Sequence, residues 1–373
     1  MTSLSNDVVL RRRLSAQRFI DRLPDATQVV RATCGIQAQE PLAAALSIRA
    51  RSRGLLVADV ERARVQERSV VRTWGLRGTF HLLATEDLPW LLPLLGPVFI
   101  AANRRRRAEL GLDEDTCMRG IRIMRDILAS RGPLTRAELV EHLATCGLRI
   151  EGQARPHLLQ RAALEGVICL GPDRGTEPTY VLLRDWVDLP QAGCSFSQEK
   201  AVVELALRYL QAYGPATPED MAAWSGLPMS WIRAAWQEIA HQLMEVEIEH
   251  RPAWEIKSSS LHLEQPLAVA SVVRLLPRYD TYLLGYQKRD LMMPALYARR
   301  VNAGGGIVHP TLLVDGRIVG TWKSKQQKSR LDVTIEPFEP LAPAVSPELE
   351  AEISDLARFL DLEVKLHIVT EYQ

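Results

Sequence analysis

A nine-residue pattern occurs twice in the middle of the chain, and this repeat restricts the possible folds more than any other feature. Residues 131–139 read RGPLTRAEL, and residues 213–221 read YGPATPEDM. The two glycines, Gly132 and Gly214, suit the positive φ with which many helices end. The repeat therefore predicts two copies of one unit, in which one helix stops and another begins a few residues later.

The threonine of each copy predicts where the second helix begins. Thr135 is followed by Glu138, and Thr217 by Asp220, at the spacing of a capping box or its acidic variant. A third helix and a β-hairpin then follow, which is the order of a winged-helix module. The expected elements are 118–130, 156–165, 167–170 and 180–183 in one copy, and 199–212, 230–241, 243–249 and 254–256 in the other. We therefore predict two winged-helix modules, at residues 112–195 and 196–266.

Residues 1–111 predict a longer version of the same plan. Helices are expected first, then two strands joined by a turn at residues 76–78, and then one more helix. The expected helices are 8–23, 27–34, 41–52, 59–67 and 86–95, and the expected strands are 70–74 and 79–83. This region predicts a third winged-helix module.

Residues 267–373 have a different character, with several short strands that predict a small β-barrel or curled sheet. Asp315-Gly316 lies between two apolar runs and predicts a hairpin with a type I′ turn. The other expected elements are strands at 269–276, 282–286, 332–336 and 363–369 and a helix at 346–360. Gly304-Gly305-Gly306 lacks the context of a phosphate-binding loop and is interpreted as a hairpin connection. The fold class is therefore α+β.

Composition excludes several classes of protein. Of 373 residues, 47% are apolar and 24% charged, which is typical of a globular protein rather than a disordered one. Proline interrupts the longest apolar stretch, residues 88–102, and an arginine triplet lies where a signal peptide would be apolar, so a cytoplasmic protein is expected. The cysteines form no C-x-x-C pair and the histidines no metal-binding pair, so we expect no disulfide, metal or other cofactor. The five cysteines are Cys34, Cys117, Cys146, Cys169 and Cys194.

The charges are segregated although the net charge is only +1. Residues 1–110 hold 18 arginines and 10 acidic residues, and residues 274–330 hold 11 basic and 3 acidic residues, so each segment carries +8. Two such segments are consistent with one composite basic surface for a polyanion such as DNA. Solvated faces scattered around the molecule would give the same counts, and the sequence leaves both interpretations open.

Two short segments carry candidate functional residues. Gln37 and Gln39 precede an expected helix and are spaced so that extended chain would point both amides to one side. They are either capping or core amides, or amides that hold a water molecule, since an amide cannot accept a proton at neutral pH. Alternation in the expected strand places Arg77, Thr79 and His81 on one face, which is either a solvated edge or a binding surface.

The chain resembles the AlkZ-like family of winged-helix DNA glycosylases, which includes azinomycin-resistance and crosslink-repair enzymes. The resemblance covers nearly the whole chain and rests on four segments in the same order. They are GIQAQ at 35–39, LRGTFHL at 76–82, LLPRYDTYLLGYQKR at 275–289 and VHPTLLVDGRIVGTW at 308–322. The first matches the family's Gln-apolar-Gln catalytic signature. Gln39 occupies the position at which the broader-range branch has Asp, which leaves the substrate range open.

The resemblance implies three tandem winged-helix modules around a concave DNA-binding face, with a C-terminal small β-barrel. It implies a monomeric, monofunctional glycosylase that removes N7-alkylated purines, bulky adducts and interstrand crosslinks included, from double-stranded DNA and leaves abasic sites. Gln37 and Gln39 would position the attacking water. The residues expected to hold DNA are Arg77, Thr79, His81, Lys288, Arg289 and His309. The alternatives are a non-catalytic tandem winged-helix transcription regulator, which would be expected to dimerise, and a protein-interaction scaffold, which would need no basic segments.

Overall fold

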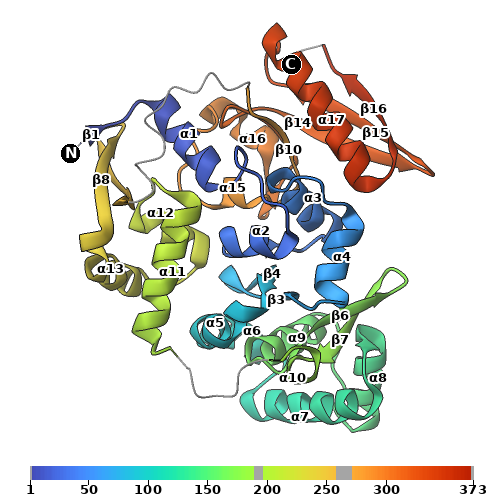
Figure 1. Ribbon diagram of the computed structural model, residues 1–373. Helices are drawn as coiled ribbons and strands as arrows, with labels where there is room; N and C mark the ends of the chain where they lie inside the picture. Colours follow the sequence, from blue (N-terminus) through green and yellow to red (C-terminus); the bar gives the residue numbers. More distant parts are fainter. Residues whose placement is uncertain (1, 189–195, 258–270, 371–373) are drawn as a thin grey trace. The chain divides into compact units, whose positions relative to one another are not determined.

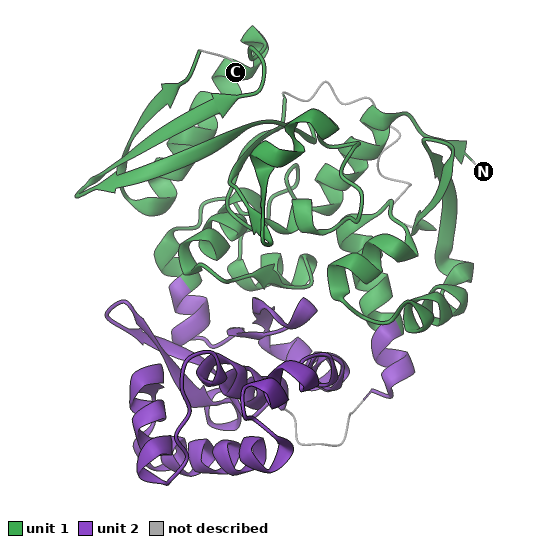
Figure 2. Cartoon of the chain, turned by 180° about the vertical axis from the view of Figure 1, so that it is seen from behind, with its two compact units in different colours: residues 1–60, 203–373 green, residues 61–202 purple. Residues whose placement is uncertain are grey.

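The computed structural model describes residues 2–188, 196–257 and 271–370 (Figure 1). The chain divides into two compact units, which Figure 2 shows in different colours. Unit 1 combines residues 1–60 with 203–373, and unit 2 comprises residues 61–202. The boundaries fall within two helices, α4 (Val57–Val65) and α11 (Gln198–Tyr213). The division into four domains stays a prediction.

Unit 1 begins with three helices at predicted places. The elements are β1 (Thr2–Ser3), α1 (Asn6–Ala16), α2 (Ala26–Ala32), β2 (Ile36–Gln37) and α3 (Pro41–Arg51). Side chains cap the first two helices, since Ser5 accepts a hydrogen bond from the Val8 amide and Asp25 from the Gln28 amide. α1 ends seven residues earlier than expected, because Arg18 has a φ of 61° that no α-helix accommodates.

The second copy of the repeat also lies in unit 1, apart from the first residues of α11. Its elements after α11 are α12 (Pro218–Ser225), α13 (Met229–Glu238), η3 (Ala240–Gln242), β8 (Leu243–Ile248) and β9 (Arg251–Ile256). The predicted capping box of Thr217 and Asp220 is confirmed. The positive φ expected at Gly214 is wrong, since its φ is not positive. Glycine is needed there for space, because a Cβ would lie 2.5 Å from the Leu210 carbonyl oxygen.

The C-terminal part of unit 1 is built on one five-stranded sheet in the order β10-β13-β14-β15-β16. Only β15 and β16 pair in parallel. Asp315 and Gly316 both have positive φ, as the predicted type I′ turn requires. The elements are β10 (Val273–Leu276), α15 (Thr281–Leu284), η4 (Ala295–Tyr297), α16 (Ala298–Val301), β11 (Asn302–Gly304), β12 (Ile307–Val308), β13 (Thr311–Val314), β14 (Arg317–Gln327), β15 (Arg330–Pro337), η5 (Pro343–Val345), α17 (Ser346–Leu360) and β16 (Glu363–Ile368).

This sheet corrects the expected barrel to a half-barrel. Among the described strands β10 and β16 are edges and do not pair with each other, so the sheet remains open. α17 packs against β10 and β16 (Figure 1). The expected strand at 282–286 is wrong, because Asp280 accepts a hydrogen bond from the Tyr282 amide at 2.9 Å and starts the short helix α15 instead. Residues 282–286 read YLLGY, and so short an apolar run does not distinguish a strand from a helix.

Unit 2 contains the rest of α4, the first copy of the repeat and a sheet whose strands run β4-β3-β6-β7-β5. The positive φ of Gly132 and the capping box of Thr135 and Glu138 are both confirmed. The elements are β3 (Val70–Trp74), η1 (Leu76–Gly78), β4 (Phe80–Ala84), η2 (Thr85–Asp87), α5 (Leu88–Ala102), α6 (Arg104–Glu109), α7 (Glu114–Arg131), β5 (Leu134–Thr135), α8 (Arg136–Thr145), α9 (Ala154–Leu164), β6 (Ile168–Arg174), β7 (Glu177–Leu182) and α10 (Leu183–Trp186). Between them, β6 and β7 extend well beyond the strands expected at 167–170 and 180–183.

Some sequence predictions fall outside the described residues, namely Cys194 and the first two residues of the strand expected at 269–276. None of the described helices is long and apolar enough to cross a membrane. In the described part of the chain, no group of three or more His, Cys, Asp or Glu side chains is arranged to hold a metal ion.

Candidate active site

Gln37 and Gln39 lie in the short extended segment that joins α2 to α3. Two residues of positive φ, Cys34 at 56° and Gly35 at 106°, turn the chain out of α2. Gln37 is the last residue of β2, and α3 begins at Pro41, which suits a first helical position because proline has no N–H to leave unpaired. Both amides are therefore attached to a segment whose ends are helices.

The two amides differ in exposure. The Gln37 side chain is buried, with 8% of the residue exposed, whereas Gln39 is exposed. The neighbouring Ile36 and Ala38 are fully buried. The two amides were expected to face one side. In the structure Gln37 is packed inside the protein, whereas Gln39 is in contact with solvent.

A buried tyrosine fixes the end of α2 next to this segment. The Tyr213 hydroxyl, on α11, donates to the Thr33 carbonyl oxygen at 3.2 Å. Burial raises the pKa of Tyr213 to about 12, so the hydroxyl keeps its proton at neutral pH and remains a donor. A Cβ on Gly285 would lie 2.3 Å from the Tyr213 ring, so glycine is required where α15 ends. No local sequence pattern identifies this role of Tyr213, because the contact joins residues 180 positions apart.

The Arg77 segment belongs to unit 2 and differs from the predicted alternation. Arg77 and Gly78 have φ values of 54° and 65°, which form a turn, and β4 begins only at Phe80. The Thr79 hydroxyl donates to the Leu76 carbonyl oxygen at 3.1 Å within this turn. The alternation predicted from residue 77 onward is therefore broken.

His81 is buried, with 2% exposed, although a solvated or binding face was expected there, and the neighbouring Phe80 is partly exposed. Burial, and then the nearby charge of Arg77, lower the pKa of His81 to about 3, although a hydrogen bond to the Thr79 carbonyl oxygen opposes this shift. The imidazole is thus neutral at pH 7. The expected orientation of His81 toward a solvated or binding face is therefore wrong, and its contact with DNA stays a prediction.

Lys288, Arg289 and His309 lie around the β11–β12 hairpin of unit 1. Arg289 Nη1 donates to Asn302 Oδ1 at 2.8 Å, and the His309 amide donates to the Val301 carbonyl oxygen at 2.9 Å. Lys288 is exposed, while Arg289 and His309 are partly exposed. Burial lowers the pKa of Arg289. The hairpin turns at three glycines of positive φ, residues 304–306, as interpreted from the sequence.

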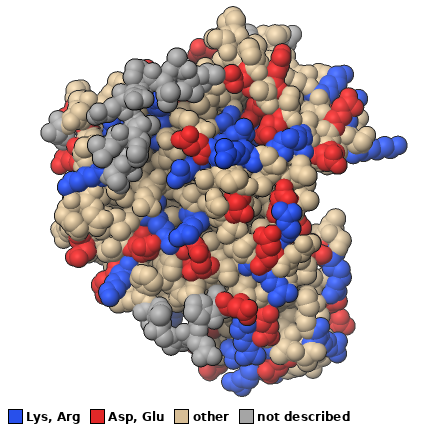
Figure 3. Space-filling view, viewed as in Figure 1, with Lys and Arg blue, Asp and Glu red and all other residues tan. Residues whose placement is uncertain are grey.

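The candidate residues are thus divided between the units. Unit 1 holds Gln37, Gln39, Lys288, Arg289 and His309, and unit 2 holds Arg77, Thr79 and His81. On the face shown in Figure 3, the Lys and Arg side chains of the described residues lie among Asp and Glu side chains.

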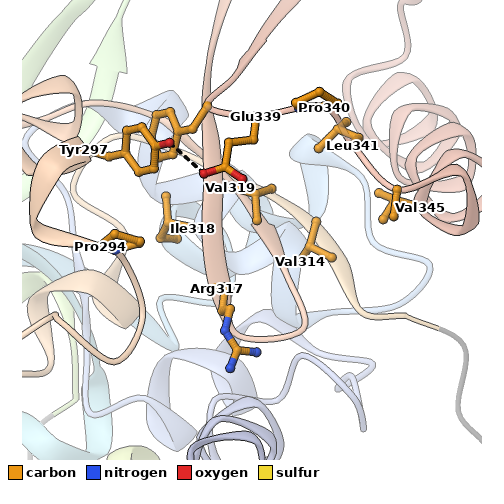
Figure 4. Close-up of a pocket in the computed structure, with 12 residues that line it drawn as sticks. Pro294, Tyr297, Val314, Arg317, Ile318, Val319, Glu339, Pro340, Leu341 and Val345 are labelled. Carbon is orange, nitrogen blue, oxygen red and sulfur yellow. Dashed lines mark hydrogen bonds between the residues drawn. The ribbon is translucent and has the colours of Figure 1, made fainter. Parts of the chain in front are cut away.

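A separate apolar pocket of about 310 Å³ lies beside β14 in unit 1 (Figure 4). Tyr297 stacks on Phe338 at its edge, with ring centroids 4.3 Å apart, and donates to Glu339 at 2.8 Å. None of the predicted site residues lines this pocket. We assign the candidate active site to the Gln37–Gln39 segment and not to the pocket.

Comparison with known proteins gives one consistent result. Residues 30–359 match the family model described as DNA glycosylase AlkZ-like. An interstrand DNA cross-link repair glycosylase of Streptomyces sahachiroi is 28% identical over 361 residues, which cover 90% of this chain and 91% of that protein. The solved structure of Streptomyces sahachiroi DNA glycosylase AlkZ has a TM-score of 0.82 and 26% identity, over 99% of this chain and 100% of that one. The chain therefore belongs to the AlkZ-like DNA glycosylase family.

Proposed function

We propose that this glycosylase hydrolyses the N-glycosidic bond of N7-alkylated purines in double-stranded DNA and leaves an abasic site. The observation that carries the proposal is the pair Gln37 and Gln39, which lies just before α3 in a chain that matches the family over residues 30–359. The Streptomyces relative is named for interstrand cross-link repair, so we include bulky adducts and crosslinks among the substrates. A transcription regulator is not favoured.

The chemistry suits two amides. Alkylation at N7 gives the purine a positive charge, so the electron pair of the breaking bond neutralises the ring and no general acid is needed. Water supplies oxygen to C1′, its proton passes to solvent, and the sugar carries positive charge in the transition state. Preorganised amide dipoles stabilise such a state and hold the water without accepting its proton. An unmodified purine would leave as an anion, so a site without a general acid would not remove it.

For DNA binding we propose phosphate contacts from Arg77, Thr79, Lys288, Arg289 and His309. We also propose that the three helix-and-hairpin regions are winged-helix modules around a concave DNA-binding face and that the enzyme acts as a monomer. A DNA substrate implies work in the compartment that holds DNA, which is the cytoplasm in a bacterium such as Streptomyces.

A single assay tests the reaction. The protein is incubated with a duplex oligonucleotide that carries one 7-methylguanine, and the DNA is then heated in alkali, which breaks the strand at abasic sites. We expect strand breaks at the modified position only. An unbroken strand at high enzyme concentration, with tight binding to the same duplex, would contradict the glycosylase and favour a binding protein.

A second assay tests the size of the substrate. The segment at 31–50 contains no Phe, Tyr or Trp, whereas enzymes that flip a base commonly stack it between aromatic rings. We therefore propose an open site in which adduct size hardly limits the rate. Single-turnover excision of a large N7-guanine adduct should match that of 7-methylguanine, and refusal of every bulky adduct would indicate a closed pocket.

A further inference from the structure

The carboxylate next to Gln39 has an unexpected partner. Glu40 is the N-cap residue of α3, yet its side chain makes no capping hydrogen bond. It instead accepts a hydrogen bond from Arg278 Nη1 at 2.8 Å, across 238 residues of sequence. The side chains are 46% and 36% exposed, so this ion pair lies at the surface.

The segment that carries Arg278 also binds the other end of α3. Two residues after Arg278, the carboxylate of Asp280 accepts hydrogen bonds from Ser47 Oγ at 2.6 Å and from both terminal nitrogens of Arg51 at 2.7 and 2.8 Å. Ser47 and Arg51 are in the last half of α3. Residues 278–280 thus hold α3 at its start and near its end.

The two attachments differ in strength. Arg51 and Asp280 are fully buried, and a buried, bidentate pair is rigid and costly to break. The Glu40–Arg278 pair is exposed, and such pairs contribute little to stability. Its removal should therefore leave the fold intact and release only the chain at the start of α3, where Gln39 lies.

We infer that Arg278 is a positioning residue, which orients the Gln37–Gln39 segment through Glu40. The inference rests on the proposed catalytic role of these amides. Misplacement of a catalytic group by about 1 Å costs on the order of 100-fold in rate. Because Gln37 is also held by packing, we expect a smaller loss, of about 10-fold, when the ion pair is removed.

A double-mutant cycle tests this role with the 7-methylguanine duplex. Arg278→Ala and Glu40→Ala should each slow single-turnover excision about 10-fold, and the double variant should be no slower than either, because both changes remove one interaction. The Kd for DNA and the midpoint of thermal unfolding should stay as in the wild type. Arg278→Lys should recover part of the rate, because it restores the charge without the fork of donors.

A matched control is available in the same unit. Arg317, on β14, forms an exposed ion pair with Asp7, on α1, at 2.7 Å. Arg317→Ala should leave excision unchanged. Unchanged rates in both Arg278→Ala and Glu40→Ala would overturn the inference. So would a weaker Kd in Arg278→Ala that Glu40→Ala does not reproduce, because Arg278 would then contact a phosphate directly.

Hydrogen exchange of residues 36–40 supplies a measurement that does not depend on activity. Loss of the pair should speed exchange there in both single variants and not in Arg317→Ala. Unchanged exchange in Arg278→Ala would overturn the inference. If exchange responds as expected but Gln37→Ala and Gln39→Ala are fully active, the ion pair positions the segment and the proposed catalytic role of the amides has failed instead.

Discussion

The two basic segments of the chain, residues 1–110 and 274–330, carry the same net charge but differ in how many of their basic side chains are buried. Six of the 18 arginines in the first segment are buried, namely Arg13, Arg49, Arg51, Arg64, Arg72 and Arg107. None of the 11 Lys and Arg residues in the second, all of which the structure describes, is buried. Equal charge in a sequence therefore does not mean equal charge available to a ligand.

The buried arginines of α3, in the first segment, form ion pairs inside the protein. Arg49 donates to Glu352 at 2.5 Å and to Asp355 at 3.0 Å, both on α17. Burial opposes the charged form, but the attraction of these carboxylates outweighs it and raises the pKa of Arg49. Arg49 and Arg51 thus attach α3 to the C-terminal half of unit 1. Lys288 is exposed and remains accessible to a DNA phosphate.

The largest expected effect tests whether the first segment is structural. Arg51→Met leaves Asp280 buried without its partner, and the loss of one member of a buried ion pair costs about 3–5 kcal/mol of unfolding free energy. Urea unfolding measures the loss. Lys323→Met is the control, because its pair with Glu336 is exposed and contributes little. A loss below about 1 kcal/mol in Arg51→Met would mean that a buried arginine of the first segment contributes no more to stability than an exposed charge of the second.

The next effect concerns catalysis by the first segment. Gln37→Ala and Gln39→Ala should each slow excision on the order of 100-fold, or about 3 kcal/mol, because a preorganised dipole is removed. DNA binding should persist, as measured by a gel-shift titration. Gln39→Asp should stay active, because a carboxylate also holds the water and favours a cationic sugar. Full activity in both alanine variants would end the catalytic assignment.

The burial of His81 adds a pH test. Its pKa is lowered from 6.5 to about 3 in the folded state. Between these values the unfolded chain binds a proton that the folded chain does not, so stability falls as pH decreases below about 6.5. The slope from this residue approaches 1.4 kcal/mol per pH unit. His81→Gln should lose this slope in urea unfolding between pH 6.5 and 4.5, and an identical slope would show that His81 is not buried.

The smallest effect tests the exposed second segment. Each phosphate contact contributes about −0.9 to the slope of log K against log salt concentration. Lys288→Ala combined with Arg289→Ala should therefore flatten the slope by up to about 2, while the unfolding free energy changes little. An unchanged slope would mean that this segment faces away from DNA and that the contrast between the segments concerns structure alone.

Several predictions from local signals agreed with the structure, although the positive φ expected at Gly214 did not. The helix predicted at 346–360 has those bounds, and the Asp315-Gly316 turn is present. Caps and turns depend on residues a few positions apart, so the sequence contains all the partners. The expected strand at 282–286 is partly helix, because Asp280 starts α15 there, and His81 is buried where a solvated or binding face was expected.

The sequence by itself determined the repeat, the capping boxes, the hairpin turns and the family, because each is a pattern of residue types at fixed spacing. Only the tertiary structure decided that residues 1–60 join 203–373 in one unit, and that six arginines of the first basic segment are buried. It alone paired Glu40 with Arg278. The physical reason is that the type of a residue determines which interactions its side chain can form, whereas the packed fold determines with which distant group it forms them.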